Sequence, residues 1–425
     1  MVLVIDFTPP KNPTQKYTTI QLVLLAFAVI LFSSVPLYFF TNTSSSPPWL
    51  SFTSNLIGTI NFGNNCNMFR GKWVYYPNGA SYTNVTCSEI FDHQNCMKFG
   101  RPDSEFLKWR WKPKQCELPL FDAVQFLELV RGKSMAFVGD SLGRNHMESL
   151  LCLLASAHVH RVPMQKLMPV KYVCWVVYPE DIVSNKTDSR FKIWIYHNYN
   201  FTLASFWSPY LVKATETEPN GPTYNRLMNL YLDETNSDWA AEIQRFDYVI
   251  ISAGRWFFGP QIFYENGQIV GCHLCQRNGI KNFTMFYGYR KAFQTAFRTL
   301  LNLKNYRGIT FLRTLSPAHF ENGEWNKGGE CKRTGPVSKL EMKLDGADLE
   351  LYETQVEELK AAEREGKVKG LKFRLLDITE AMVVRPDGHP NHYGHRADEN
   401  GTIADCVHWC LPGPIDTWNA FCFTC

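Results

Sequence analysis

The chain has 425 residues, of which 45% are hydrophobic and 20% are charged. This composition is ordinary for a folded protein and excludes wholesale disorder. The 44 Lys and Arg residues nearly balance the 40 Asp and Glu residues, and no block of like charge stands out, which argues against a reader of nucleic acid. Aromatic residues make up 14%, with 12 Trp. Such residues can stack on sugar rings, although packing in a core is their commoner use.

An uncharged apolar stretch spans residues 20–40 and is long enough to cross a bilayer as a helix. Lys11 and Lys16 precede it and no charged residue follows before Arg70, so the positive-inside rule leaves residues 1–19 in the cytosol. A cleaved signal peptide is the alternative, but the run is long and no clear cleavage site follows. We expect a signal anchor, followed by a Ser-, Thr- and Pro-rich stem over residues 41–65.

The cysteine content favours an oxidising compartment for the rest of the chain. There are thirteen cysteines, an odd number, so at least one lacks a partner within the chain. Cys272 and Cys275 have the C-x-x-C spacing, but no second pair supplies further zinc ligands, and a short structural disulfide is expected. Six glycosylation sequons follow the apolar stretch, beginning at Asn42, Asn84, Asn185, Asn200, Asn282 and Asn400.

The chain changes character near residue 121. Residues 66–120 are rich in Cys, Trp and Pro and show little periodicity, whereas helical and strand patterns alternate afterwards. Helices are expected at 123–131, 141–157, 289–303 and 347–365, and buried strands at 133–138, 246–253, 308–315 and 371–378. This alternation predicts an α/β fold with a parallel sheet covered on both faces. Residues 191–207 alternate apolar and polar side chains, which predicts an inserted hairpin.

Ser141 is the first candidate for chemistry. The run from Phe137 to Ser141 takes a strand directly into a turn and a helix, and active sites of such sheets lie beyond the carboxyl ends of the strands. A backbone N–H at a helix N-terminus can also help to hold an oxyanion. The alternative is that Ser141 or Asp140 merely caps the helix.

Asp405 and His408 are the candidate partners of Ser141. Their spacing lets the carboxylate reach one ring nitrogen and fix the tautomer, so that the other nitrogen can take the Ser141 proton. The spacing by itself is common, and a buried histidine in a Cys- and Trp-rich turn is the alternative.

The two candidates occur within a larger set of motifs. Gly139-Asp140-Ser141 is followed by Arg144 and Asn145, and Asp405 opens the run Asp-Cys-Val-His-Trp-Cys-Leu-Pro-Gly. Further motifs are Phe69-Arg-Gly-Lys-Trp73, Gly100-Arg-Pro-Asp103, Trp109-Arg-Trp111 and Asp387-Gly-His-Pro390. Together they resemble the plant trichome birefringence-like family, over nearly all of residues 66–421.

The resemblance implies a Golgi type II membrane protein that O-acetylates a cell-wall polysaccharide. It implies a three-layer α/β/α domain similar to SGNH/GDSL esterases over residues 121–425, with the 66–120 segment packed on it. By this resemblance, Ser141 is the nucleophile, His408 is the base, and Asp405 is the group that orients His408. No metal or tightly bound cofactor is needed. The acetyl donor is a co-substrate of unknown identity, and a membrane protein could supply the acetyl group.

The family also implies a disulfide framework. Cys66 would pair with Cys116 and Cys87 with Cys152, while Cys96 and Cys331 would pair with Cys406 and Cys410 in some order. The pairing of Cys174, Cys422 and Cys425 stays open.

One branch of the family shares further motifs with this chain. These are Ser252-Ala-Gly-Arg-Trp-Phe257, Tyr264-Glu-Asn-Gly267, Val270-Gly-Cys-His-Leu-Cys275 and His319-Phe-Glu-Asn-Gly-Glu-Trp325. They resemble xyloglucan O-acetyltransferases, which acetylate galactosyl residues. The expected mechanism is double displacement through an acetylated Ser141, with the N–H groups of Ser141 and Gly254 at the oxyanion. Asp140, Arg144 and Asn145 would support the active site. For Arg144 and Asn145 the alternative is a place on the helix surface with local hydrogen bonds.

Trp256, Phe257 and Tyr264 are candidate platforms on which sugar rings could stack. They lie in a 255–290 insert, and packing of that insert onto the domain is the alternative.

Two alternative functions use the same triad. One is a polysaccharide acetylesterase, and the other is an O-acetyltransferase acting on xylan, mannan or pectin. A polysaccharide-binding protein with an inactive triad is a third. His389, His392 and His395 recur every three residues, but Gly and Pro make that segment a loop and no metal site is expected.

Overall fold

The computed structural model describes residues 66–156, 179, 181–185, 188–217, 226–395 and 403–424. The expected tail, anchor and stem lie outside this part, as do the sequons at Asn42 and Asn400 and the cysteines Cys174 and Cys425. Within it, no helix is both long and apolar enough to cross a membrane.

A seven-stranded sheet forms the centre of the domain, in the order β13-β12-β9-β3-β6-β5-β4. Five neighbouring strands are parallel: β13 (Lys372–Leu376), β12 (Ile309–Arg313), β9 (Tyr248–Ser252), β3 (Ser134–Gly139) and β6 (Phe201–Trp207). The last two, β5 (Asp188–Tyr196) and β4 (Asp181–Asn185), run antiparallel to their neighbours. The sheet is therefore mixed, and the expectation of a parallel sheet holds for its first five strands only.

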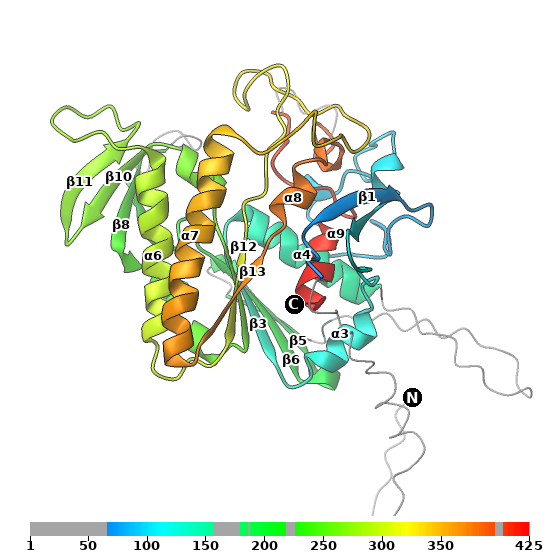
Figure 1. The fold of residues 1–425 in the computed structure, drawn as a ribbon, viewed down its shortest axis with the longest axis horizontal. Coiled ribbons are helices and arrows are strands. Elements are labelled where there is room, and N and C mark those ends of the chain that lie inside the picture. The colour runs from blue at the N-terminus through cyan, green and yellow to red at the C-terminus, as the bar shows by residue number, and fades with distance from the viewer. Residues whose placement is uncertain are drawn as a thin grey trace, which may run out of the picture. The chain divides into compact units, whose positions relative to one another are not determined.

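Helices cover both faces of this sheet (Figure 1). On one face lie α6 (Met285–Asn302) and α7 (Gly346–Lys369), and on the other α3 (Ala123–Leu129), α4 (Ser141–Ala155) and α9 (Asp416–Thr424). The short helices α5 (Ser237–Ala240) and α8 (Thr379–Met382) complete the set. The three inner parallel strands, β3, β9 and β12, are almost fully buried, as expected for strands with a helical layer on each side. The predicted α/β class is confirmed.

The hairpin predicted at 191–207 forms, but it is not an insertion. Its second strand, β6, pairs in parallel with β3, so the hairpin extends the central sheet. Alternation predicted two half-buried strands but could not show which sheet they join.

A second, four-stranded sheet was not predicted. It consists of β7 (Val212–Glu216), β8 (Met228–Thr235), β10 (Gln261–Glu265) and β11 (Gln268–His273), in the order β11-β10-β8-β7. It packs against α6, on the side away from α4 (Figure 1).

Two helix lengths also differ from expectation. Helix α6 begins about one turn earlier than predicted, and α7 runs on to Lys369. Gly370 ends α7 in the left-handed conformation, with φ 71°, where a glycine avoids the Cβ clash. Charged residues do not end a helix, so the charged sequence near the end of α7 could not predict the residue at which the helix stops.

The N-terminal segment packs against the loops near the C-terminus. It contains the two-stranded sheet of β1 (Gly71–Tyr75) and β2 (Trp109–Pro113). The Trp73 indole N–H donates to the Ala381 carbonyl at 2.7 Å. The buried Arg101 guanidinium donates to the carbonyls of Asp387 at 2.6 Å and His389 at 2.9 Å. Two of the sequence motifs thus contact later parts of the chain, namely α8 and the 387–389 segment.

Candidate active site

Ser141 begins α4 directly beyond the end of β3. The helix is capped by Asp140, whose carboxylate accepts from the N–H groups of Leu142 at 3.1 Å and Gly143 at 3.3 Å. A Cβ at Gly139 would lie 1.9 Å from the Ser252 carbonyl oxygen, so the turn requires glycine there. Because Asp140 does the capping, the Ser141 hydroxyl is left for another partner.

That partner is His408. Ser141 Oγ lies 2.7 Å from His408 Nε2, and His408 Nδ1 lies 2.7 Å from Asp405 Oδ2. The other carboxylate oxygen accepts from the N–H groups of Val407 at 3.0 Å and His408 at 2.9 Å. The carboxylate needs a donor, so Nδ1 carries the hydrogen and Nε2 can accept the hydroxyl hydrogen. The three residues proposed from sequence therefore form one hydrogen-bonded chain.

The charges in this chain stabilise each other. Burial by itself would lower the pKa of His408, but the Asp405 carboxylate outweighs it and the pKa is raised. Burial by itself would raise the pKa of Asp405, but His408 and the two backbone N–H groups outweigh it and the pKa falls well below its usual range. The side chains keep 23% and 21% of their surfaces exposed, so a substrate can reach them. An ionised Asp405 beside a basic His408 suits proton transfer.

Asn145 joins α4, the helix that begins at Ser141, to the turn that carries His408. Its side chain is fully buried, accepts from the Trp409 N–H at 2.8 Å and donates to the Trp409 carbonyl at 3.2 Å. It is thus a positioning residue for the neighbouring His408, and the alternative of a merely surface-covering role is wrong for it.

The other predicted supporting residues have different surroundings. Gly254 lies two residues beyond Ser252, whose strand partner is Gly139, so Gly254 and Ser141 follow neighbouring strands at the same sheet edge. Arg144 lies with its guanidinium carbon 4.8 Å from the ring centroid of Trp207, rather than hydrogen-bonded within the triad.

The three candidate sugar platforms differ in their surroundings. Phe257 is fully buried beside Tyr289, which corrects its assignment as a platform, because a core side chain cannot meet a polymer. Tyr264 lies on β10 and stacks on Tyr231, in the four-stranded sheet on the far side of α6. Trp256 is 42% exposed and remains accessible.

Among the described residues there are five disulfides: Cys66–Cys116, Cys87–Cys152, Cys96–Cys410, Cys272–Cys275 and Cys331–Cys406. The structure resolves the order that the sequence left open for Cys96 and Cys331. The Cys331 bridge ends at Cys406, between Asp405 and His408, and the Cys96 bridge ends at Cys410, two residues beyond His408. Of the sequons, Asn200 and Asn282 are exposed and Asn84 is half-buried, while Asn185 ends β4.

Sequence reasoning missed the role of His389. Its Nδ1 donates to the His408 carbonyl at 2.6 Å, and its Nε2 lies 2.6 Å from His319 Nδ1. Burial lowers the pKa of His319 to about 4 and that of His389 far below its usual range. No group of metal-ligating side chains occurs among the described residues. The link to His408 crosses 19 residues of sequence, which no local pattern reveals.

Comparisons with known proteins agree with this geometry. Residues 118–425 match the GDSL/SGNH-like acyl-esterase family found in Pmr5 and Cas1p, and residues 64–117 match the PMR5 N-terminal domain. Protein trichome birefringence-like 19 of Arabidopsis thaliana is 50% identical over 88% of this chain and 84% of its own length.

Xyloglucan O-acetyltransferase 4 of Populus trichocarpa is 42% identical over 83% of this chain and 79% of its own length. Xyloglucan O-acetyltransferase 1 of the same species is 39% identical over 96% and 91%. The chain therefore belongs to the trichome birefringence-like proteins, within the GDSL/SGNH-like acyl-esterase family.

Proposed function

We propose that the chain is an O-acetyltransferase that acetylates hydroxyl groups of a plant cell-wall polysaccharide, with galactosyl residues of xyloglucan as the acceptor. The class is supported by relatives that are xyloglucan O-acetyltransferases over most of the chain. The observation that carries the mechanism is the Ser141–His408–Asp405 chain, with two contacts of 2.7 Å.

The reaction proceeds by double displacement. Ser141 Oγ attacks the acetyl carbonyl of the donor while His408 Nε2 takes the hydroxyl proton, and the leaving group departs with that proton. A sugar hydroxyl then gives its proton to His408 and attacks the acetyl-Ser141 carbonyl. The ester is released as the proton returns to Ser141. The N–H groups of Ser141 and Gly254 would hold the oxyanion in both steps.

The test uses the purified full-length chain, an acetyl donor and deacetylated xyloglucan, with mass spectrometry of the sugar and assay of free acetate. Acetylated galactosyl residues are expected. Free acetate without acetylated sugar would instead identify a polysaccharide acetylesterase. Acetylation of xylan, mannan or pectin, but not of xyloglucan, in parallel reactions would identify a different acceptor polysaccharide. An acetylated peptide containing Ser141, found after the donor alone, supports the first step.

The location follows from the same proposal. Residues 20–40 would anchor the chain in the Golgi membrane, with everything after them in the lumen. Protease protection of intact Golgi vesicles tests this: the domain after residue 65 should survive, and its digestion without detergent would refute a lumenal site.

A further inference from the structure

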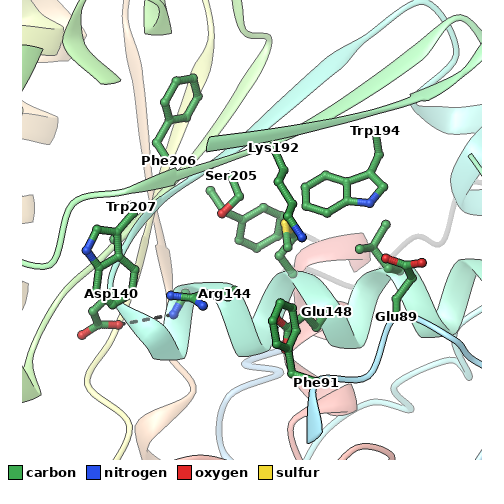
Figure 2. A pocket seen from close by; sticks show the side chains of 15 residues that line it. Glu89, Phe91, Asp140, Arg144, Glu148, Lys192, Trp194, Ser205, Phe206 and Trp207 are labelled. Atoms are coloured by element: carbon green, nitrogen blue, oxygen red, sulfur yellow. Dashed lines mark hydrogen bonds between the residues drawn. The ribbon is translucent and has the colours of Figure 1, made fainter. Parts of the chain in front are cut away.

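A recess lies beside the nucleophile, between α4, β5, β6 and the N-terminal segment (Figure 2). It begins at Asp140 and runs along α4 past Arg144 and Glu148. Its volume is about 40 Å³, which at roughly 10–15 Å³ each accommodates about three groups of the size of a water molecule.

Two buried polar groups in the wall of this recess have no partner. Glu148 is 1% exposed, and neither of its carboxyl oxygens makes a hydrogen bond. Trp194 is 3% exposed, and its indole N–H is also unpaired. Buried groups of this kind are nearly always satisfied in native proteins, so two in one recess point to an occupant with its own hydrogen-bonding groups.

Two cations also face the recess (Figure 2). The Arg144 guanidinium lies over the rings of Trp207 and Phe91, at 4.8 and 5.8 Å, and the Lys192 ammonium lies 5.4 Å from the Phe91 ring. Neither cation forms a salt bridge with any described residue within 4.0 Å. They therefore have hydrogens to donate to an occupant.

The chemistry of the walls defines the occupant. Burial raises the pKa of Glu148 to about 8, so at neutral pH its carboxyl group can both donate and accept. Phe91 is 41% exposed and supplies a flat apolar surface at the rim. A neutral pyranose combines an apolar C–H face with a ring of hydroxyls, which can accept from the two cations and donate to the Glu89 carboxylate on the wall.

We propose that this recess, lined by Glu89, Phe91, Arg144, Glu148, Lys192 and Trp194, binds the hydroxyl-bearing edge of a neutral sugar ring of the acceptor. The proposal rests on the function proposed above. It places the acceptor on the α4–β5 side of Ser141, next to Trp256, whose ring centroid lies 5.5 Å from that of Trp207 in the recess wall. Glu148 and Lys192 then contact hydroxyls, and Phe91 lies against the ring.

The test measures binding without turnover. Full-length Ser141→Ala chain is titrated by calorimetry with a galactose-bearing xyloglucan oligosaccharide, and Lys192→Met and Glu148→Leu are added to that background. Each should weaken binding at least tenfold. Lys213→Met, on the four-stranded sheet, is the matched control and should leave binding unchanged.

Stability separates binding from folding. Glu148→Leu replaces an unpaired buried carboxyl by an apolar group, so its melting temperature should equal or exceed that of the parent while binding is lost. Unchanged affinity in both variants would overturn the proposal, as would tighter binding of an oligogalacturonide than of the neutral sugar. This assay needs no catalysis. A chain that binds the sugar but never forms acetyl-Ser141 would therefore refute the proposed function and leave the binding proposal standing.

Discussion

At the scale of single residues, the contact between Asp405 and His408 would set the pH range of the proposed reaction at Ser141. His408 must be neutral to accept the Ser141 proton, and its pKa is raised by the Asp405 carboxylate. Activity should therefore rise with pH through a midpoint above the usual histidine value of about 6.5. Asp405→Asn removes the charge, so its midpoint should lie lower, with a much lower plateau. A kcat/KM profile from pH 5 to 9 measures both, and coinciding midpoints would contradict the assignment.

The nucleophile gives the simplest residue-scale prediction. Ser141→Ala should lower transfer by about 10⁴–10⁶-fold, because no acetyl-enzyme can form. Its melting temperature should stay close to wild type, since Asp140 and not Ser141 caps α4. His408→Ala should lower the rate comparably. A folded Ser141→Ala protein that keeps most transfer activity would remove the mechanism.

Glu148 predicts a pH dependence of stability. Its carboxyl pKa is about 8 in the folded protein and about 4.3 in an unfolded chain, so folding takes up a proton between these values. Stability from this group is therefore greatest at low pH and declines as pH rises towards 8. Glu148→Gln should abolish that decline and melt higher than wild type at pH 8. Thermal scans from pH 5 to 9 test this, and a constant difference at every pH would contradict it.

At the scale of elements, the docking of the His408 turn on α4 depends on Asn145. Asn145→Ala leaves the Trp409 N–H and carbonyl unpaired and buried, which should cost about 2–4 kcal/mol of unfolding free energy. Because the turn also carries His408, kcat should fall more than KM changes. Asn145→Asp keeps the bond from the Trp409 N–H and should recover part of the stability. Denaturant unfolding and kinetics decide, and a change in stability with unaltered kcat would make Asn145 purely structural.

The Cys331–Cys406 bridge fixes the other side of that turn. Replacing both cysteines by Ser should lower stability by about 2–5 kcal/mol and reduce kcat, because Cys406 adjoins Asp405. The Cys272–Cys275 bridge closes only a three-residue separation on the four-stranded sheet. Its double Ser variant is the control and should keep wild-type transfer rates. An equal fall in kcat in both variants would show that the Cys331–Cys406 bridge has no specific role in positioning the active site.

At the scale of the whole domain, the N-terminal segment holds the segment at 387–389 in place, which we call the clamp. Arg101 donates hydrogen bonds to two carbonyls of that segment. The same segment carries His389, which donates to the His408 carbonyl. Arg101→Gln should destabilise the domain by about 3 kcal/mol and lower kcat. The exposed Lys98→Gln should change stability by less than about 0.5 kcal/mol. A wild-type rate in Arg101→Gln would show that the clamp is not needed for chemistry.

Local patterns in the sequence determined the α/β class, the site of Ser141 at a strand–helix junction and the pairing of Asp405 with His408. These features depend on neighbours within one or two turns, and periodicity or spacing reports them directly. The same reasoning left open whether Phe257 is buried, because an aromatic side chain has the same pattern in a core and on a surface.

Only the tertiary structure brought His408 to Ser141 across 267 residues, and it also decided the strand order, the mixed sheet and the four-stranded sheet. It likewise assembled the recess at Glu148 from four separate stretches of chain. Such features depend on which elements pack together, and packing is a property of the whole fold. A buried carboxyl on α4 reads in the sequence as one more polar residue of a helix, and only its surroundings show that it lacks a partner.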